Sequence, residues 1–164
     1  MKQMVAITLL VSAFGLIAFG QTRTEPYFET LLGMPVTSPQ VQEFVKTNGL
    51  MHLPTTPDHS ICKSTNSAFF LALRSNRVWQ VCVTLGTIEG LKQSEPFPPY
   101  LGKMPYELTR NDTAEAVVQR LGTPSRRKEW AKGFLISLYY DKLRLCLDFD
   151  GKSQHLLYAT WTED

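Results

Sequence analysis

Residues 134–161, FLISLYYDKLRLCLDFDGKSQHLLYATW, predict three consecutive β-strands. From 143 to 149, three leucines and a phenylalanine alternate with polar residues, a period of two that is typical of a strand with one buried face. An apolar, aromatic run precedes it at 134–140, and a second alternating run follows at 154–162. The short connections Asp141-Lys142 and Asp150-Gly151-Lys152 favour turns. The stretch therefore predicts an antiparallel meander, whose apolar face needs a helix to cover it.

The helix expected to cover this meander lies just before it. Asp112-Thr113-Ala114-Glu115 resembles a capping box, and it opens an apolar stripe at Ala114, Val117, Val118 and Leu121. Gly122 ends the helix and Pro124 prevents its extension. Residues 125–132 are polar and are expected to form a loop.

The first half of the chain follows the same order. Ser38-Pro39 is a good helix start, Phe44 and Val45 share an apolar face with Val41, and Gly49 ends the helix. Residues 50–60 contain two prolines and predict a loop. A short strand is expected to begin at 61–63, and strands follow at 67–73 and 78–85.

The predicted fold is α+β, with two tandem helix–antiparallel β-meander modules forming one compact unit. The first module covers residues 21–93 and the second covers 107–164. Four prolines lie within 94–106, so this segment is expected to be an extended linker.

The helix that ends in Leu121-Gly122-Thr123-Pro124, followed by a meander, resembles the module of the β-lactamase inhibitor protein family, which carries two such modules in tandem. It also resembles the small outer-membrane assembly lipoproteins of the BamE kind, which carry one. The opening at Leu31–Pro35 is similar to that of an uncharacterised bacterial family. The resemblance spans about 31–161 and implies two helix-plus-sheet modules that bind a target with the open sheet face. It transfers no ligand motif, and the odd cysteine set departs from the paired cysteines of the inhibitor.

The first twenty residues have the pattern of a secretory signal. Lys2 supplies a positive start, 5–19 is apolar, and Ala18-Phe19-Gly20 is a small-x-small cleavage site before Gln21. The apolar run is shorter than the roughly 20 residues of a spanning helix. We therefore expect an exported protein, periplasmic or extracellular, with no membrane span after cleavage; an uncleaved anchor is the alternative.

Charge and cysteine content narrow the function classes. The formal net charge is +2, and removing Lys2 with the signal leaves +1, so the chain lacks the basic field of a nucleic-acid-binding protein. Cys62, Cys82 and Cys146 are an odd number in an oxidising compartment, so at most one internal disulfide forms; buried free thiols are the alternative.

The sequence contains no catalytic or nucleotide-binding signature, and we expect a non-enzymatic protein with no cofactor and no metal. The alternative is a small hydrolase or metal-dependent enzyme that uses the His52–Cys62 loop, where His52, Asp58, His59 and Cys62 lie close together.

The open face of the meander is the better functional candidate. Strict alternation directs Arg144, Cys146 and Asp148 away from the covering helix. The residues predicted to bind a partner on this face are Phe70, Gln80, Arg144, Leu156 and Tyr158. Aromatic and arginine side chains are typical interface anchors, so we expect a protein partner in the cell envelope, bound in an inhibitor-like, immunity-like or assembly-accessory role. A face that packs on the other half, or that is only solvated, is the alternative.

Overall fold

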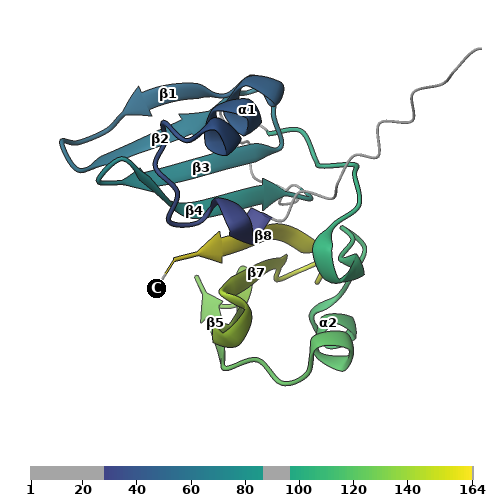
Figure 1. Cartoon of the computed structure of the whole chain (residues 1–164). Coiled ribbons are helices and arrows are strands. Elements are labelled where there is room, and N and C mark those ends of the chain that lie inside the picture. The colour runs from purple at the N-terminus through teal and green to yellow at the C-terminus, as the bar shows by residue number, and fades with distance from the viewer. Residues whose placement is uncertain (1–27, 87–96, 164) are drawn as a thin grey trace, which may run out of the picture.

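The computed structural model describes residues 28–86 and 97–163. The predicted signal at 1–20 and the first part of the predicted linker lie outside these ranges. The described chain forms one eight-stranded antiparallel sheet with two α-helices and three short 3-10 helices (Figure 1). Neither α-helix in these ranges has the length and apolar character that crossing a membrane requires.

The sheet is built from two runs of four strands that meet at its centre. The strands are β1 (Met51–Pro54), β2 (His59–Lys63), β3 (Phe69–Arg74), β4 (Arg77–Thr84), β5 (Arg126–Trp130), β6 (Leu135–Tyr140), β7 (Leu145–Asp150) and β8 (Leu156–Thr162). Their order across the sheet is β1-β2-β3-β4-β8-β7-β6-β5. The last strand of each run therefore pairs with the last strand of the other, antiparallel, with Val81 opposite Trp161.

The two α-helices bury their apolar side chains in the same core cluster on one face of the sheet. Helix α1 (Pro39–Thr47) begins after Ser38, with proline at its first position, and it is followed by Gly49 at φ 61°. Helix α2 (Ala114–Leu121) is capped by Thr113, whose Oγ1 accepts a hydrogen bond of 3.2 Å from the Ala116 amide. The expected capping box with Asp112 as the N-cap is therefore wrong: the N-cap is Thr113, and the Asp112 carboxylate bonds to Arg120 instead.

An aromatic cluster fills the core where the two runs of strands meet. The 3-10 helix η1 (Phe28–Leu31) places Phe28 with its ring centroid 5.1 Å from that of Trp161 on β8 and 5.6 Å from that of Phe69 on β3. The ring centroid of Tyr100 lies 5.0 Å from that of Phe69. One continuous core therefore spans both halves of the described chain.

The two outermost strands correct the sequence-based expectation. Residues 50–60 and 125–132 were expected to be loops, but β1 and β5 lie within them. Every residue of both strands is exposed, so neither shows the alternation of a half-buried strand. Pro54 is tolerated because β1 lies at the sheet edge, and the charges of Arg126, Arg127 and Lys128 suit the opposite edge.

Two irregularities also change the predicted faces. The register of β7 and β8 shifts between Asp148 and Phe149, which places Leu156 opposite Phe149 and Tyr158 opposite Asp148. Leu156 is consequently wholly buried in the core, and its predicted place on the open face is wrong. The chain between β6 and β7 forms the 3-10 helix η3 (Asp141–Leu143), after which Arg144 takes a left-handed conformation and lies outside the strand.

Candidate interaction surface

The face of the sheet opposite the core cluster, here called the open face, can be followed by register from one edge to the other. A complete row runs across all eight strands through Met51, Lys63, Phe70, Cys82, Thr160, Cys146, Tyr139 and Arg126. A second, shorter row runs beside it through Thr84, Tyr158, Asp148, Ser137 and Lys128. Thr84, Ser137 and Thr160 are buried although they belong to this face.

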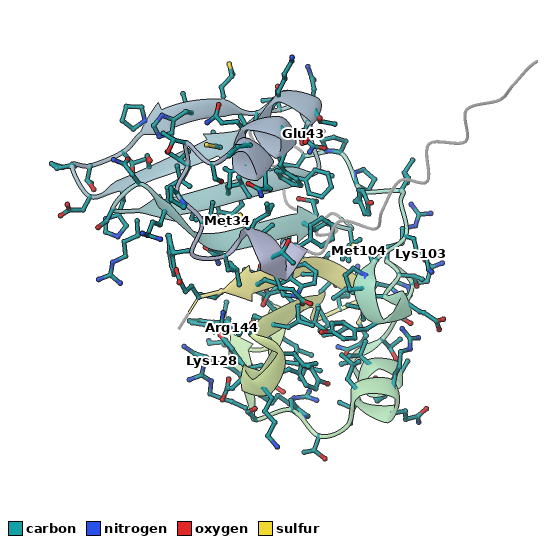
Figure 2. The ribbon with its side chains drawn as sticks, viewed as in Figure 1. Met34, Glu43, Lys103, Met104, Lys128 and Arg144 are labelled. Carbon is teal, nitrogen blue, oxygen red and sulfur yellow. The ribbon has the colours of Figure 1, made fainter. Side chains whose placement is uncertain are left out.

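The predicted binding residues do not all reach the open face. Phe70, Gln80 and Tyr158 lie on it and are half-buried. Arg144 is exposed but follows η3, so its position is beside the strands rather than on their face (Figure 2). Leu156 lies in the core, as described above. The structure therefore brings together three of the five.

The richest part of the open face surrounds Asp148. We define the Asp148 patch as Arg126, Lys128, Trp130, Ser137, Tyr139, Cys146, Asp148 and Tyr158, which come from β5, β6, β7 and β8. The Trp130 indole Nε1 donates a hydrogen bond of 2.9 Å to the Ser137 hydroxyl. That hydroxyl donates a short hydrogen bond to Asp148 Oδ1, and the Cys146 thiol donates a longer one of 3.8 Å to the same oxygen. A polar chain thus leads from the exposed edge strand to the half-buried carboxylate.

Two cation–π contacts lie on the edge-strand side of the patch. The Arg126 Cζ atom lies 4.0 Å from the ring centroid of Tyr139, and the Lys128 Nζ atom lies 3.2 Å from that of Trp130. Trp130 is still 40% exposed, which is high for so large an apolar side chain. These contacts favour the observed arrangement of the aromatic and cationic groups on the surface.

Burial sets the protonation behaviour of the patch. Burial raises the pKa of Asp148, although hydrogen bonds from Ser137 and Cys146 oppose the rise. Burial, followed by the nearby Asp148 charge, raises the pKa of Cys146 to about 12. Burial likewise raises the pKa of Cys82 to about 11, against the hydrogen bond from Thr160. Both thiols are therefore poor nucleophiles near neutral pH.

Sequence reasoning missed the β5 side of the patch because it treated 125–132 as a loop. The alternation of Arg126, Lys128 and Trp130 was present, but the residues between them are also charged. A strand with two polar faces gives no hydrophobic period. Ser137 and Tyr139 were missed because the apolar run of β6 was not divided into two faces.

The His52–Cys62 segment does not form one cluster. His52 pairs in register with Cys62, but its Nε2 lies 2.8 Å from Ser60 Oγ. His59 and Cys62 are three residues apart on β2, so their side chains point to opposite faces. Cys62 is wholly buried, and burial raises its pKa. In residues 28–86 and 97–163, no group of three or more His, Cys, Asp or Glu side chains is arranged to hold a metal ion.

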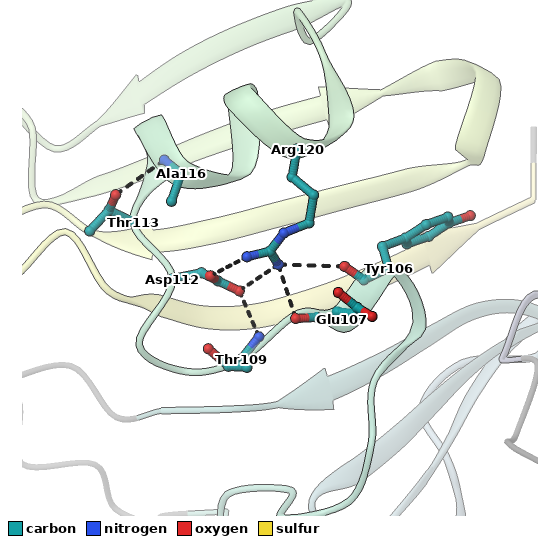
Figure 3. A network of polar contacts seen from close by, with 7 residues as sticks. All are labelled: Tyr106, Glu107, Thr109, Asp112, Thr113, Ala116 and Arg120. Carbon is teal, nitrogen blue, oxygen red and sulfur yellow. Dashed lines mark hydrogen bonds and ion pairs between the residues drawn. The ribbon is translucent and has the colours of Figure 1, made fainter.

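The polar network around Asp112 and Arg120, shown in Figure 3, belongs to the scaffold. Arg120 on α2 forms a two-pronged contact with Asp112, at 2.8 and 3.0 Å, and also donates to the backbone carbonyl of Glu107 at 2.9 Å. Asp112 Oδ2 accepts a further hydrogen bond of 2.7 Å from the Thr109 amide. The network fastens α2 to the segment that leads into it, at the 3-10 helix η2 (Pro105–Glu107).

The Asp148 patch is thus the part of the open face in which exposed aromatic rings, fixed cations and a half-buried carboxylate adjoin. Comparisons with protein-family models, curated proteins and solved structures find no match for this chain.

Proposed function

We propose that this protein binds another protein through the open face of its sheet and has no enzymatic activity of its own. The observation that carries the proposal is the chain of contacts from Trp130 through Ser137 to Asp148, flanked by the two cation–π pairs. Tryptophan, tyrosine and arginine dominate the binding energy of protein interfaces, and the Asp148 patch contains all three.

The patch is suited to binding because its side chains are already ordered. Trp130 is held by both a hydrogen bond and a cation–π contact, and Ser137 and Asp148 lie on the interior strands β6 and β7. Side chains that are fixed before binding lose less conformational entropy when a partner arrives. A rigid sheet that presents fixed aromatic and charged groups therefore favours recognition of a folded protein surface.

The architecture supports a further part of the proposal, that the two halves are tandem copies of one helix-plus-meander unit. Each half runs from an α-helix into four antiparallel strands, and the final strands β4 and β8 pair with each other. This order agrees with the resemblance to the β-lactamase inhibitor protein family and the BamE-like lipoproteins. With the signal-like segment at 1–20, we propose an exported, inhibitor-like, immunity-like or envelope-assembly role.

The test is a capture experiment from the envelope fraction of the native host, with purified wild-type protein as bait. Trp130→Ala is the test variant, because it removes the exposed anchor without opening the core. Glu43→Ala is the matched control, because Glu43 is exposed on α1, away from the open face (Figure 2). Circular dichroism and urea unfolding verify that both variants fold as the wild type does.

We expect one protein to be retained by wild type and by Glu43→Ala but lost from Trp130→Ala. The captured protein, once purified, should bind Trp130→Ala at least tenfold more weakly than wild type, which is the loss typical of an interface anchor. Equal retention by all three baits, or by none of them, overturns the proposal that the open face is the binding surface.

A further inference from the structure

The Asp148 carboxylate uses only one of its two oxygens inside the protein. Both hydrogen bonds that it accepts, from Ser137 and from Cys146, reach Oδ1. Within the described residues, Oδ2 accepts no hydrogen bond, and it is not among the buried polar atoms that lack a partner. Oδ2 is therefore not fully buried, and the Asp148 side chain lies on the open face, with β6 on one side and β8 on the other.

The described part of the chain provides no ion pair for this carboxylate. The nearest cation in the same row is Lys128 on β5, two strand spacings away, which corresponds to about 10 Å between backbones. Its ammonium group lies against the Trp130 ring instead. A partly desolvated carboxylate without a counter-charge is unfavourable in the folded protein. The charge on Asp148 therefore does not stabilise the fold.

Aromatic groups adjoin the carboxylate on both sides. On one side, Tyr158 on β8 lies directly opposite Asp148. On the other side, Tyr139 lies on β6 two residues from Ser137, and Trp130 on β5 donates a hydrogen bond to Ser137. A carboxylate oxygen with aromatic rings around it is the chemical setting that binds an ammonium or guanidinium group, through charge, hydrogen bonding and cation–π attraction. Sulfur and hydroxyl groups at Oδ1 hold the carboxylate in position for such a contact.

We propose that Asp148 receives a lysine or arginine side chain of the partner protein, which inserts between Tyr158 and Trp130 and bonds to Oδ2. This inference rests on the proposed function, and it identifies the partner's anchoring side chain as a basic one. Arg126 and Lys128 lie on the edge-strand side of the patch, so the partner's basic side chain is flanked by carboxylates that meet these two residues. The occupant is a protein surface with one protruding basic residue inside an acidic rim.

The test uses single-residue probes and needs no identified partner. Nα-acetyl-arginine methylamide and Nα-acetyl-lysine methylamide are titrated into isotopically labelled protein, and amide shifts of Ser137, Asp148 and Tyr158 are followed by NMR. Nα-acetyl-citrulline methylamide and Nα-acetyl-norleucine methylamide are the neutral counterparts. The variant is Asp148→Asn, which keeps an acceptor for the Ser137 hydroxyl and removes the charge.

We expect saturable, millimolar binding of a cationic probe to the wild type, weakened at least fivefold in Asp148→Asn, with no saturable shift from the neutral probes. Absence of saturable shifts in the patch up to 100 mM probe, or equal binding by Asp148→Asn, overturns the inference. Neither result bears on the proposed function, because that proposal is tested separately by capture with Trp130→Ala. If a captured partner binds wild type and Asp148→Asn equally, the open face is an interface but Asp148 is not its anchor.

Discussion

The ring centroid of Phe28 lies 5.1 Å from that of Trp161, and this contact joins the start of the described chain to its final strand. Phe28 is 1% exposed and also touches the rings of Phe69 and Tyr100. Because it packs across the line where β4 meets β8, Phe28 should stabilise both halves of the sheet at once. We predict that Phe28→Ala lowers the free energy of unfolding by about 3–5 kcal/mol.

Urea unfolding followed by circular dichroism checks this prediction. The control is Leu101→Ala, because Leu101 is 87% exposed and its truncation should change stability by no more than about 0.5 kcal/mol. A single cooperative transition in Phe28→Ala, shifted to lower urea, is expected, since the core is continuous. Similar unfolding midpoints for the two variants would contradict the central role of Phe28.

The Asp112–Arg120 pair predicts a loss of stability in acid. Burial alone would raise the pKa of Asp112, but hydrogen bonds from Arg120 and Thr109, with the Arg120 charge, lower it below its usual value. A lowered folded-state pKa gives stability that is present above the unfolded pKa, near 4, and is lost as pH falls through the folded pKa. Asp112→Asn should therefore cost about 1.5–3 kcal/mol at pH 7, the range for hydrogen bonds to charged groups.

The measurement is the free energy of unfolding of wild type and Asp112→Asn between pH 2 and pH 7. The difference between them should shrink as the pH falls, because protonated Asp112 loses its charge in both the folded and the unfolded wild type. Arg120→Lys is a second variant: it keeps the charge but not the two-pronged geometry, and it should lose part of the same stability. A difference that is constant with pH would contradict the role of the ion pair.

The interior strands could be predicted from the sequence, whereas the edges could not. Leu145, Leu147 and Phe149 alternate with polar residues because β7 has one face in the core, and that period is visible without a structure. β1 and β5 have no buried residues, so their pairing leaves no hydrophobic pattern. Pro54 argued against a strand, although an edge strand tolerates it. The joining of β4 to β8 depends on contacts far apart in the sequence.

The candidate site was predictable to the extent that alternation held. Tyr158 and Phe70 were assigned to the open face correctly because the period of two holds from Phe69 to Ala72 in β3 and from Tyr158 to Thr162 in β8. Leu156 was misplaced because one register shift moves a residue to the other face. Trp130 was missed because its neighbours on β5 are all charged. The hydrogen bonds to Asp148 arise from side chains of different strands, which no local pattern encodes.

The three thiols should be free and slow to react. Cys62 lies on the core side of β2, and Cys82 and Cys146 lie on the open face with Thr160 between them. Two strand spacings separate these last two backbones, about 10 Å, which exceeds the reach of a disulfide. We predict three free thiols by mass spectrometry of the unreduced, alkylated protein under denaturing conditions.

Native protein should react with an aromatic disulfide reagent far more slowly than unfolded protein at pH 8. With pKa values of about 11 for Cys82 and about 12 for Cys146, at most roughly one thiol in a thousand is ionised. Thr160→Val removes the hydroxyl that donates to Cys82 and should slow its reaction further, since that bond favours the thiolate. Rapid labelling of native wild type, or an intact disulfide, would contradict this assignment.

Asp148 should behave in the opposite way to Asp112. Burial raises its pKa, so the folded protein holds the proton more tightly than the unfolded chain, and stability is lost as pH rises from about 4 through the folded pKa. The charged and titratable groups around it are Lys128 on β5, Tyr139 on β6, Cys146 on β7, Tyr158 on β8 and Cys82 on β4.

We therefore predict that Asp148→Asn is more stable than wild type at pH 7, by more than the roughly 0.5 kcal/mol typical of surface substitutions. The gain should vanish below the unfolded pKa, where wild-type Asp148 is protonated in both states. Paired urea titrations from pH 3 to pH 8 measure this gain, and Asp141→Asn serves as the control because Asp141 is exposed at the start of η3. A destabilised Asp148→Asn at pH 7 would mean that the ionised carboxylate supports the fold. A stabilised variant would instead show that the ionised Asp148 carboxylate lowers the stability of the folded protein. The need for a stable fold would then not explain why this position carries a charge.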